Sequence, residues 1–133
     1  MAFQLSTTLR NAALDAIEAA IGASPTLELR SGPPPASCAA ADSGILLASM
    51  ALPADFLAAA SGGSKALAGI WQDAAADAAG TVGHFRIKQG ATCHVQGTVT
   101  GTGGGGDMTI DNPVLALGQQ VSVTAFTLTA GGA

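Results

Sequence analysis

The stretch TVGHFRIKQGATCHVQGTVTGTGGGGDMTI, residues Thr81–Ile110, decides the fold, because two runs of alternating apolar and polar residues flank a short turn. The runs cover residues 82–88 and 92–100, and residues 89–91 supply the turn. One face of the hairpin carries Gly83, Phe85, Ile87, Cys93, Val95, Gly97 and Val99. The other carries His84, Arg86, Lys88, His94, Gln96, Thr98 and Thr100. A period of two residues is typical of half-buried strands, so this stretch predicts a β-hairpin at the centre of a sheet.

The composition fits one domain with few charges. The chain has 133 residues, of which 48% are hydrophobic and only 11% are charged, with a net charge of −4. Solvated monomeric proteins carry roughly twice that charged fraction, so the composition favours a surface that is largely covered by other protein. The five basic residues are scattered along the chain, and phosphate recognition needs clustered ones, so nucleic acid is not an expected partner.

Neither end of the sequence nor its interior suggests export or a membrane. The start, Met1–Arg10, lacks the basic residue and long apolar run of a secretory signal, which predicts synthesis and retention in a cytoplasm. The most apolar window, Ile45 to Pro53, has the length of a strand and not that of a membrane span. We therefore expect no membrane partner.

A helix is predicted over residues 6–22. Ser6, Thr7 or Thr8 can cap its first amides and Gly22 can end it. The apolar stripe consists of Leu9, Ala13, Ile17 and Ile21, with Ala16 and Ala20 beside it, whereas Arg10, Asp15 and Glu18 fall away from it. This pattern favours an amphipathic helix that covers one end or face of the sheet, and a helix that docks on a neighbouring subunit is the alternative.

The remaining segments complete a mainly β domain over residues 26–130. Further strands are predicted at 26–31, 45–52 (central, because both faces are apolar), 65–71, 107–110 and 120–129, the last with either a bulge near Ala125 or burial of both faces. The Pro-rich segment 32–44 and the Gly-rich segment 101–106 are predicted to be mobile loops, and 72–80 a connecting loop. Residues 1–133 thus predict one domain: an antiparallel two-layer β-sandwich, jelly-roll or Ig-like, of about seven strands with one N-terminal α-helix.

Several apparent chemical motifs fail in their context. Residues 101–106 contain G-x-G-x-x-G, but a phosphate-binding loop must lead into a helix and this one leads into a strand. His84 and His94 lie on outward positions of adjacent strands, with Cys38 or Cys93 as conceivable further zinc ligands, yet the closely spaced ligand pairs of structural zinc are missing. The expected state of both histidines is solvated or in a subunit contact. Without a nucleophile elbow or paired carboxylates in a cleft, we predict no enzyme, no metal site and no cofactor.

Cys38 and Cys93 are a candidate disulfide. Cys93 is expected to face inward on the hairpin, and the Pro-fixed loop that holds Cys38 can fold over it. A cytoplasmic origin argues for free thiols, whereas a particle released into an oxidising medium can acquire the bond later.

Four segments together carry a family resemblance: LRNAALDAI (9–17), GASPTLELRSG (22–32), GTVGHFRI (80–87) and VSVTAFTLTAG (121–131). In their order along the chain they resemble a family of small virion proteins of tailed bacteriophages. The resemblance covers nearly the whole chain, and it implies a particle component without a catalytic motif.

The resemblance implies a virion protein made in the cytoplasm of a bacterial host. The first expectation is a capsid decoration or cement protein that stabilises the shell through contacts with a major capsid or other virion protein. The low charge and the alanine-rich surface favour a homo-oligomer, and we expect a homotrimer. The alternatives are a tail or baseplate component and a receptor- or carbohydrate-binding virion module, although a single Trp, four Phe and no Tyr offer few rings for stacking on sugars.

Overall fold

A computed structural model describes residues 3–132. The protein is mainly β, with one helix and nine strands in this range. The elements are α1 (Thr7–Ile21), β1 (Thr26–Ser31), β2 (Leu46–Ala51), β3 (Ser64–Ala66), β4 (Gln72–Asp73), β5 (Gly80–Gln89), β6 (Thr92–Gly101), β7 (Met108–Ile110), β8 (Val114–Leu115) and β9 (Val121–Thr129). About seven strands were predicted; the two-residue strands β4 and β8 are too short to leave an alternating pattern in the sequence.

The strands form one mixed sheet that is not a closed barrel. Its order is β2-β1-β5-β6-β7-β9-β3, with β4 paired to β9 and β8 paired to β5. The pairing is antiparallel except between β6 and β7, which are parallel, so the predicted purely antiparallel sheet is wrong at this pair. The Gly-rich segment 101–106 turns the chain back to the level of Val99, and β7 then runs beside the last three residues of β6 in the same direction.

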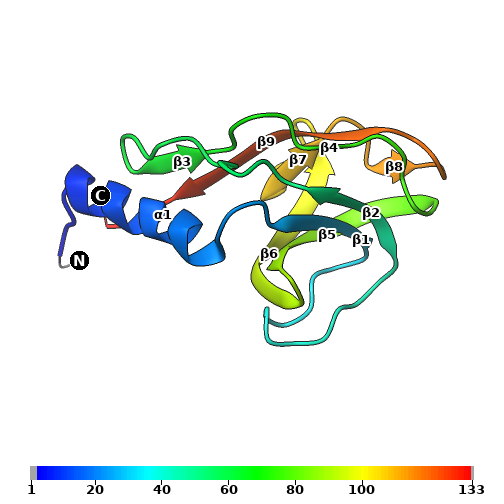
Figure 1. The fold of residues 1–133 in the computed structure, drawn as a ribbon, viewed down its shortest axis with the longest axis horizontal. Coiled ribbons are helices and arrows are strands. Elements are labelled where there is room, and N and C mark those ends of the chain that lie inside the picture. The colour runs from blue at the N-terminus through cyan, green and yellow to red at the C-terminus, as the bar shows by residue number, and fades with distance from the viewer. Residues whose placement is uncertain (1–2, 133) are drawn as a thin grey trace.

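The predicted hairpin, β5 and β6, lies in the middle of the sheet (Figure 1). The sheet folds over so that β9 lies against β5, and the rings of Phe85 and Phe126 meet edge to face at 5.4 Å. Trp71 packs against Phe126 at 5.7 Å and is itself 1% exposed. These rings, with Leu27 and Leu29 of β1, form the centre of one continuous apolar core.

β2 lies at the end of the sheet path, although its apolar sequence predicted a central strand. The free edge of β2 is covered by β4 and by the segment that follows β4. The amide of Asp77 donates to the carbonyl of Leu47 at 2.8 Å, and the amide of Ser49 donates to the Asp73 carboxylate at 3.1 Å. An edge strand covered in this way is buried on both faces, which explains the misleading pattern.

Helix α1 has the predicted ends but is rotated about its axis, so that of the predicted apolar stripe Ile21 is buried and the other three residues are exposed. Ser6 caps it and Gly22, with φ of 89°, ends it. The side that packs on the body carries Asn11, Leu14, Glu18 and Ile21, whereas Leu9 is 53% and Ile17 is 37% exposed.

Backbone amides of the body that need hydrogen-bond acceptors set this orientation of α1. The Asn11, Asp15 and Glu18 side chains accept hydrogen bonds from the backbone amides of residues 63, 60 and 57, at 2.9, 3.1 and 3.1 Å. Such amides are costly to bury without partners, so they attract the polar side of the helix. The predicted apolar stripe over Leu9, Ala13 and Ile17 consequently faces away from the sheet.

Two bulges decide which residues share a face. On β9 the partner of Ile110 is Val123 and that of Thr109 is Ala125, so Thr124 is the extra residue, confirming the predicted bulge near Ala125. On β6 the register shifts where Lys88 pairs with Cys93. This shift places Cys93 on the face of Lys88, outside the core, and the predicted inward Cys93 is wrong for that reason.

Candidate functional site

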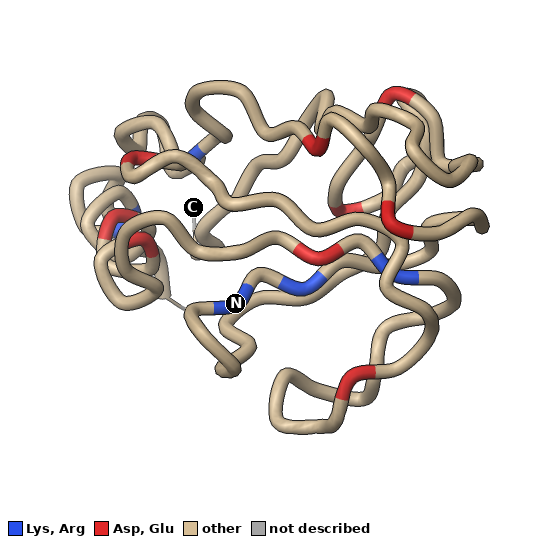
Figure 2. The backbone as a smooth tube through the Cα atoms, turned by 45° about the vertical axis from the view of Figure 1, so that its right-hand side comes forward, with Lys and Arg blue, Asp and Glu red and all other residues tan. Residues whose placement is uncertain are grey.

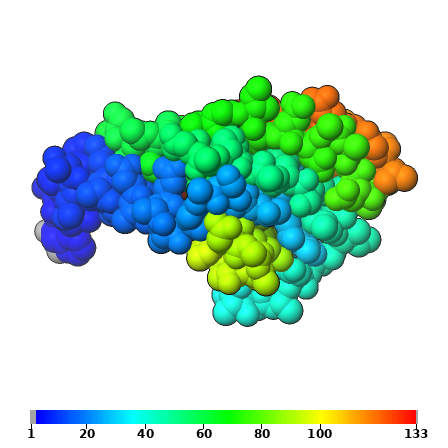
Figure 3. All heavy atoms as spheres, in the orientation of Figure 1, coloured from blue at the N-terminus to red at the C-terminus, as the bar shows by residue number. Residues whose placement is uncertain are grey.

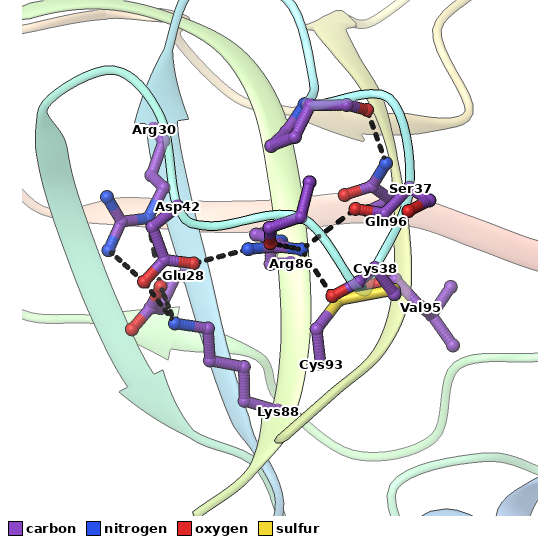
Figure 4. A network of polar contacts seen from close by, with 12 residues as sticks. Glu28, Arg30, Ser37, Cys38, Asp42, Arg86, Lys88, Cys93, Val95 and Gln96 are labelled. Carbon is purple, nitrogen blue, oxygen red and sulfur yellow. Dashed lines mark hydrogen bonds and ion pairs between the residues drawn. A yellow bond between two sulfur atoms is a disulfide. The ribbon is translucent and has the colours of Figure 1, made fainter. Parts of the chain in front are cut away.

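The 32–44 loop lies across the outer face of β1 and β5 and covers a cluster of charged side chains (Figure 4). The cluster consists of Arg30, Arg86 and Lys88 on the strands, Glu28 beside them, and Asp42 from the loop. Three of the five basic residues of the chain thus meet in one place. No local pattern predicts this cluster, because Asp42 is 44 residues away from Arg86 in the chain.

Arg86 is the centre of the cluster and is 2% exposed. Its Nη1 donates to Asp42 Oδ1, and its Nη2 donates to the carbonyls of Ser37, Cys38 and Ala40 at 3.3, 2.9 and 3.1 Å. A buried guanidinium needs partners for its fork of donors, and the loop provides them for both terminal nitrogens, whereas the buried Nε has none. Arg86 therefore fixes the path of the loop.

Asp42 joins the loop to three cations. Its Oδ2 accepts from Lys88 Nζ at 2.6 Å and from Arg30 Nη2 at 3.3 Å. The hydrogen bond from Lys88, opposed by partial burial and reinforced by Arg86 and Arg30, lowers the pKa of Asp42 from 3.8 to about 2. Asp42 is therefore ionised in the folded protein at any pH above about 3.

Cys38 and Cys93 form a disulfide between the loop and β6, with Cα atoms 5.2 Å apart. Further contacts follow along the loop: Gln96 Nε2 donates to the Pro35 carbonyl at 2.7 Å, and His84 Nδ1 lies 2.9 Å from the Gly32 carbonyl. At Gly83 a side-chain carbon would overlap the Gly32 carbonyl oxygen, so only glycine permits this close approach.

The covered face explains an error in the prediction for His84. His84 is fully buried, as Arg86 and Lys88 nearly are, although the alternating pattern placed all three outward towards solvent or a subunit. The loop takes the place of solvent. His94 is exposed, and the register places Thr98, not His94, opposite His84. Within residues 3–132 no group of three or more His, Cys, Asp or Glu side chains is arranged to hold a metal ion.

A second ion cluster fastens α1 to β3. Lys65 is 2% exposed, and its Nζ contacts Asp15 at 2.6 Å and Glu18 at 3.0 Å. The hydrogen bond from Lys65 lowers the pKa of Asp15, and the two carboxylates raise the pKa of Lys65 against its burial. Figure 2 shows the acidic positions spread over the molecule, with most of the backbone uncharged.

Two groups of exposed apolar side chains lie at opposite ends of the molecule, and Ile70, which is 77% exposed, belongs to neither group. At one end, every exposed residue of α1 from Leu9 to Ala20 except Asp15 is apolar, namely Leu9, Ala12, Ala13, Ala16, Ile17, Ala19 and Ala20. We name this set the helix face. At the other end, beside β8, Ile45 is 61%, Val114 is 60% and Leu117 is 73% exposed, and we name these three the β8 face. Figure 3 shows the two ends, blue for the helix and orange for the segment around β8.

The Gly-rich segment 101–106 connects β6 to β7, a strand, and so lacks the following helix that a phosphate-binding loop requires. In the part of the chain that the structure describes, no helix is long and apolar enough to cross a membrane. No protein-family model, curated protein or solved structure matches this chain.

Proposed function

We propose that the protein is a structural component of a bacteriophage virion, and specifically a capsid decoration protein that bridges neighbouring shell subunits as a homo-oligomer. The curled sheet then serves as a two-layer sandwich, β2, β1, β5 and β6 in one layer and β7, β9 and β3 in the other. Its jelly-roll or Ig-like classification stays a prediction.

The observation that carries the proposal is the presence of exposed apolar side chains on the helix face and on the β8 face, at opposite ends of one body. Leu9 is 53% exposed on the helix face and Leu117 is 73% exposed on the β8 face. Contiguous exposed apolar surface marks contact sites in soluble proteins, and its burial contributes about 25 cal/mol per Å². A protein that bridges two neighbours needs two such surfaces, and these point in different directions.

The body between the two faces is fastened at several points. The Cys38–Cys93 disulfide and the Asp42 cluster hold the longest loop on the sheet, while Lys65 holds α1. A passive clamp benefits from such rigidity because little conformational entropy is lost on binding. The disulfide also suits a protein that works outside the reducing cytoplasm, as a released particle does.

The aromatic side chains support a clamp over a carbohydrate-binding module. Phe56, Trp71, Phe85 and Phe126 are at most 4% exposed, which leaves Phe3 as the exposed ring among residues 3–132. Sugar recognition uses exposed rings for stacking, and one ring at the N-terminus provides little of that surface.

Reconstitution with shells tests the proposal. Shells of the encoding phage that lack the protein are mixed with wild-type protein, Leu9→Asp or Leu117→Asp, and their survival of heating and low salt is measured. Each variant places a charge on one of the two faces, and Ala91→Asp, at an exposed position of the β5–β6 turn that belongs to neither face, is the matched control.

We expect wild type and Ala91→Asp to protect the shells and the two leucine variants to fail. Light scattering is expected to give a mass above that of one chain for wild type, with a homotrimer as our preferred state. Binding to isolated tails in place of shells would favour a tail or baseplate component, and shells that survive equally without the protein would refute decoration.

A further inference from the structure

The short strand β7 leaves a gap in the sheet. β7 has three residues and pairs with residues 99–101 of β6 on one side and with residues 123–126 of β9 on the other. Both neighbours continue past it, β6 back to Thr92 and β9 on to Thr129. Figure 1 shows β6 and β9 diverging below β7. Two strand edges therefore flank a space that no strand fills.

On the β6 edge, one backbone amide shows which residues point into the gap. The Thr98 amide donates to Asp107 Oδ2 at 2.9 Å, so it faces away from β5. Backbone groups alternate along an antiparallel strand, and Gln96 therefore presents its N–H and C=O on the same edge. Val95, which pairs with Ile87, directs its backbone groups towards β5.

On the β9 edge, backbone hydrogen bonds to the segment around β3 show which residues of β9 point into the gap. The Leu67 amide donates to the Phe126 carbonyl, and the Ala130 amide donates to the Gly63 carbonyl, both at 3.0 Å. The backbone N–H and C=O groups of Phe126, Leu128 and Ala130 therefore point towards β3. By alternation Thr129 presents its N–H and C=O to the gap, beyond the last residue paired with β7.

The gap is also a hollow of about 370 Å³, lined by β5, β6, β9 and Asp107. Four of its lining residues are apolar (Phe85, Val95, Phe126 and Leu128), and the other four are polar (Gln96, Asp107, Thr127 and Thr129). Asp107 contributes the one carboxylate of the lining. The hollow thus combines a place for apolar side chains with backbone donors and acceptors along its rims.

We propose that this gap binds an extended peptide segment of another protein by strand addition, in line with β7. Open strand edges pair with an incoming backbone, and the alternating side chains of the segment provide selectivity. The apolar residues of the segment enter the hollow above Phe85 and Phe126, its polar residues face solvent, and a basic residue lies beside Asp107. This site goes beyond the proposed function and does not depend on it.

Hydrogen exchange of the free protein tests the open edges. Amides of Gln96 and Thr129 are expected to exchange rapidly, and those of Val95 and Leu128, which bond to β5 and β3, slowly. Equal protection at all four positions would show that the edges are already satisfied and would overturn the proposal.

Peptide binding tests the occupant. The probes are blocked pentapeptides of the form Lys-X-Thr-X-Thr, with X as Val, Ile, Leu or Phe. Their binding to the protein is followed by NMR at peptide concentrations up to the millimolar range. At least one is expected to shift and protect the amides of Gln96 and Thr129 and to contact the Phe85 and Phe126 rings. The matched probe carries N-methyl groups at the residues that pair with the edges; losing two hydrogen bonds is expected to weaken binding about tenfold.

A pair of variants separates the site from the fold. Thr129→Pro removes an amide that has no partner here, so the chain should fold and lose peptide binding, whereas Leu128→Pro removes an amide bonded to β3 and should destabilise the protein. The proposal is wrong if no probe binds, if N-methylation leaves affinity unchanged, or if the shifts lie away from the gap.

Discussion

Removing the disulfide is expected to destabilise the protein by a large, calculable amount. Cys38 and Cys93 are 55 residues apart in the chain, and closing a loop of that length in the unfolded state is worth about 4 kcal/mol at 25 °C. The variant Cys38→Ser/Cys93→Ser loses this constraint. Because Arg86 and Asp42 still hold the loop, the folded state should keep its shape, and the loss should appear as a lower free energy of unfolding.

Urea unfolding followed by tryptophan fluorescence measures the difference, since Trp71 lies in the core. We expect the double variant to unfold at a lower free energy by about 2 to 4 kcal/mol and wild type with reductant to match it. The double variant with reductant is the control and should not change further. A difference below about 1 kcal/mol between wild type and variant would refute the chain-entropy argument.

Three further predictions concern the buried contacts. Because the folded-state pKa of Asp42 is lowered to about 2, its contribution to stability is complete well above pH 4 and is lost as the pH falls through about 2. With this side chain about one-third exposed, we expect a pH series of unfolding curves to show a loss of about 1 to 2 kcal/mol, which Asp42→Asn should abolish. The double change Asp15→Asn/Glu18→Gln removes both countercharges of the buried Lys65 ammonium and should destabilise the protein in urea unfolding more than Lys65→Met does. The reverse order would contradict a buried ion cluster. Gly83→Ala forces the loop away from β5 and should lower the free energy of unfolding by about 1 to 3 kcal/mol, an effect that thermal unfolding would detect and that unchanged stability would disprove.

The sequence predicts the elements that depend on local pattern. The hairpin of β5 and β6 follows from alternation, and the ends of α1 follow from Ser6 and Gly22. The bulge in β9 follows from Val121 and Phe126 being apolar on opposite phases of one strand. In each case the signal lies within a few neighbouring residues.

The elements that depend on distant contacts are not predicted. The local pattern predicts that Arg86 is exposed to solvent. The loop residues that bury it, 37–42, are distant in the sequence, and no local pattern predicts their contact with Arg86. The apolar stripe of α1 reads as its packing side, but the amides of residues 57, 60 and 63 require the polar side instead. Polar satisfaction at long range thus overrides hydrophobic periodicity in both places.

The central claim, that the protein is part of a phage particle, is tested most directly by a density map of the particle of the phage that we propose encodes it. The account predicts density for this fold on the outer surface of the capsid, repeated with the symmetry of the shell, with Leu9 of the helix face against one neighbour and Leu117 of the β8 face against another. Density confined to the tail or baseplate, or particles that contain no copy of the protein, would contradict it.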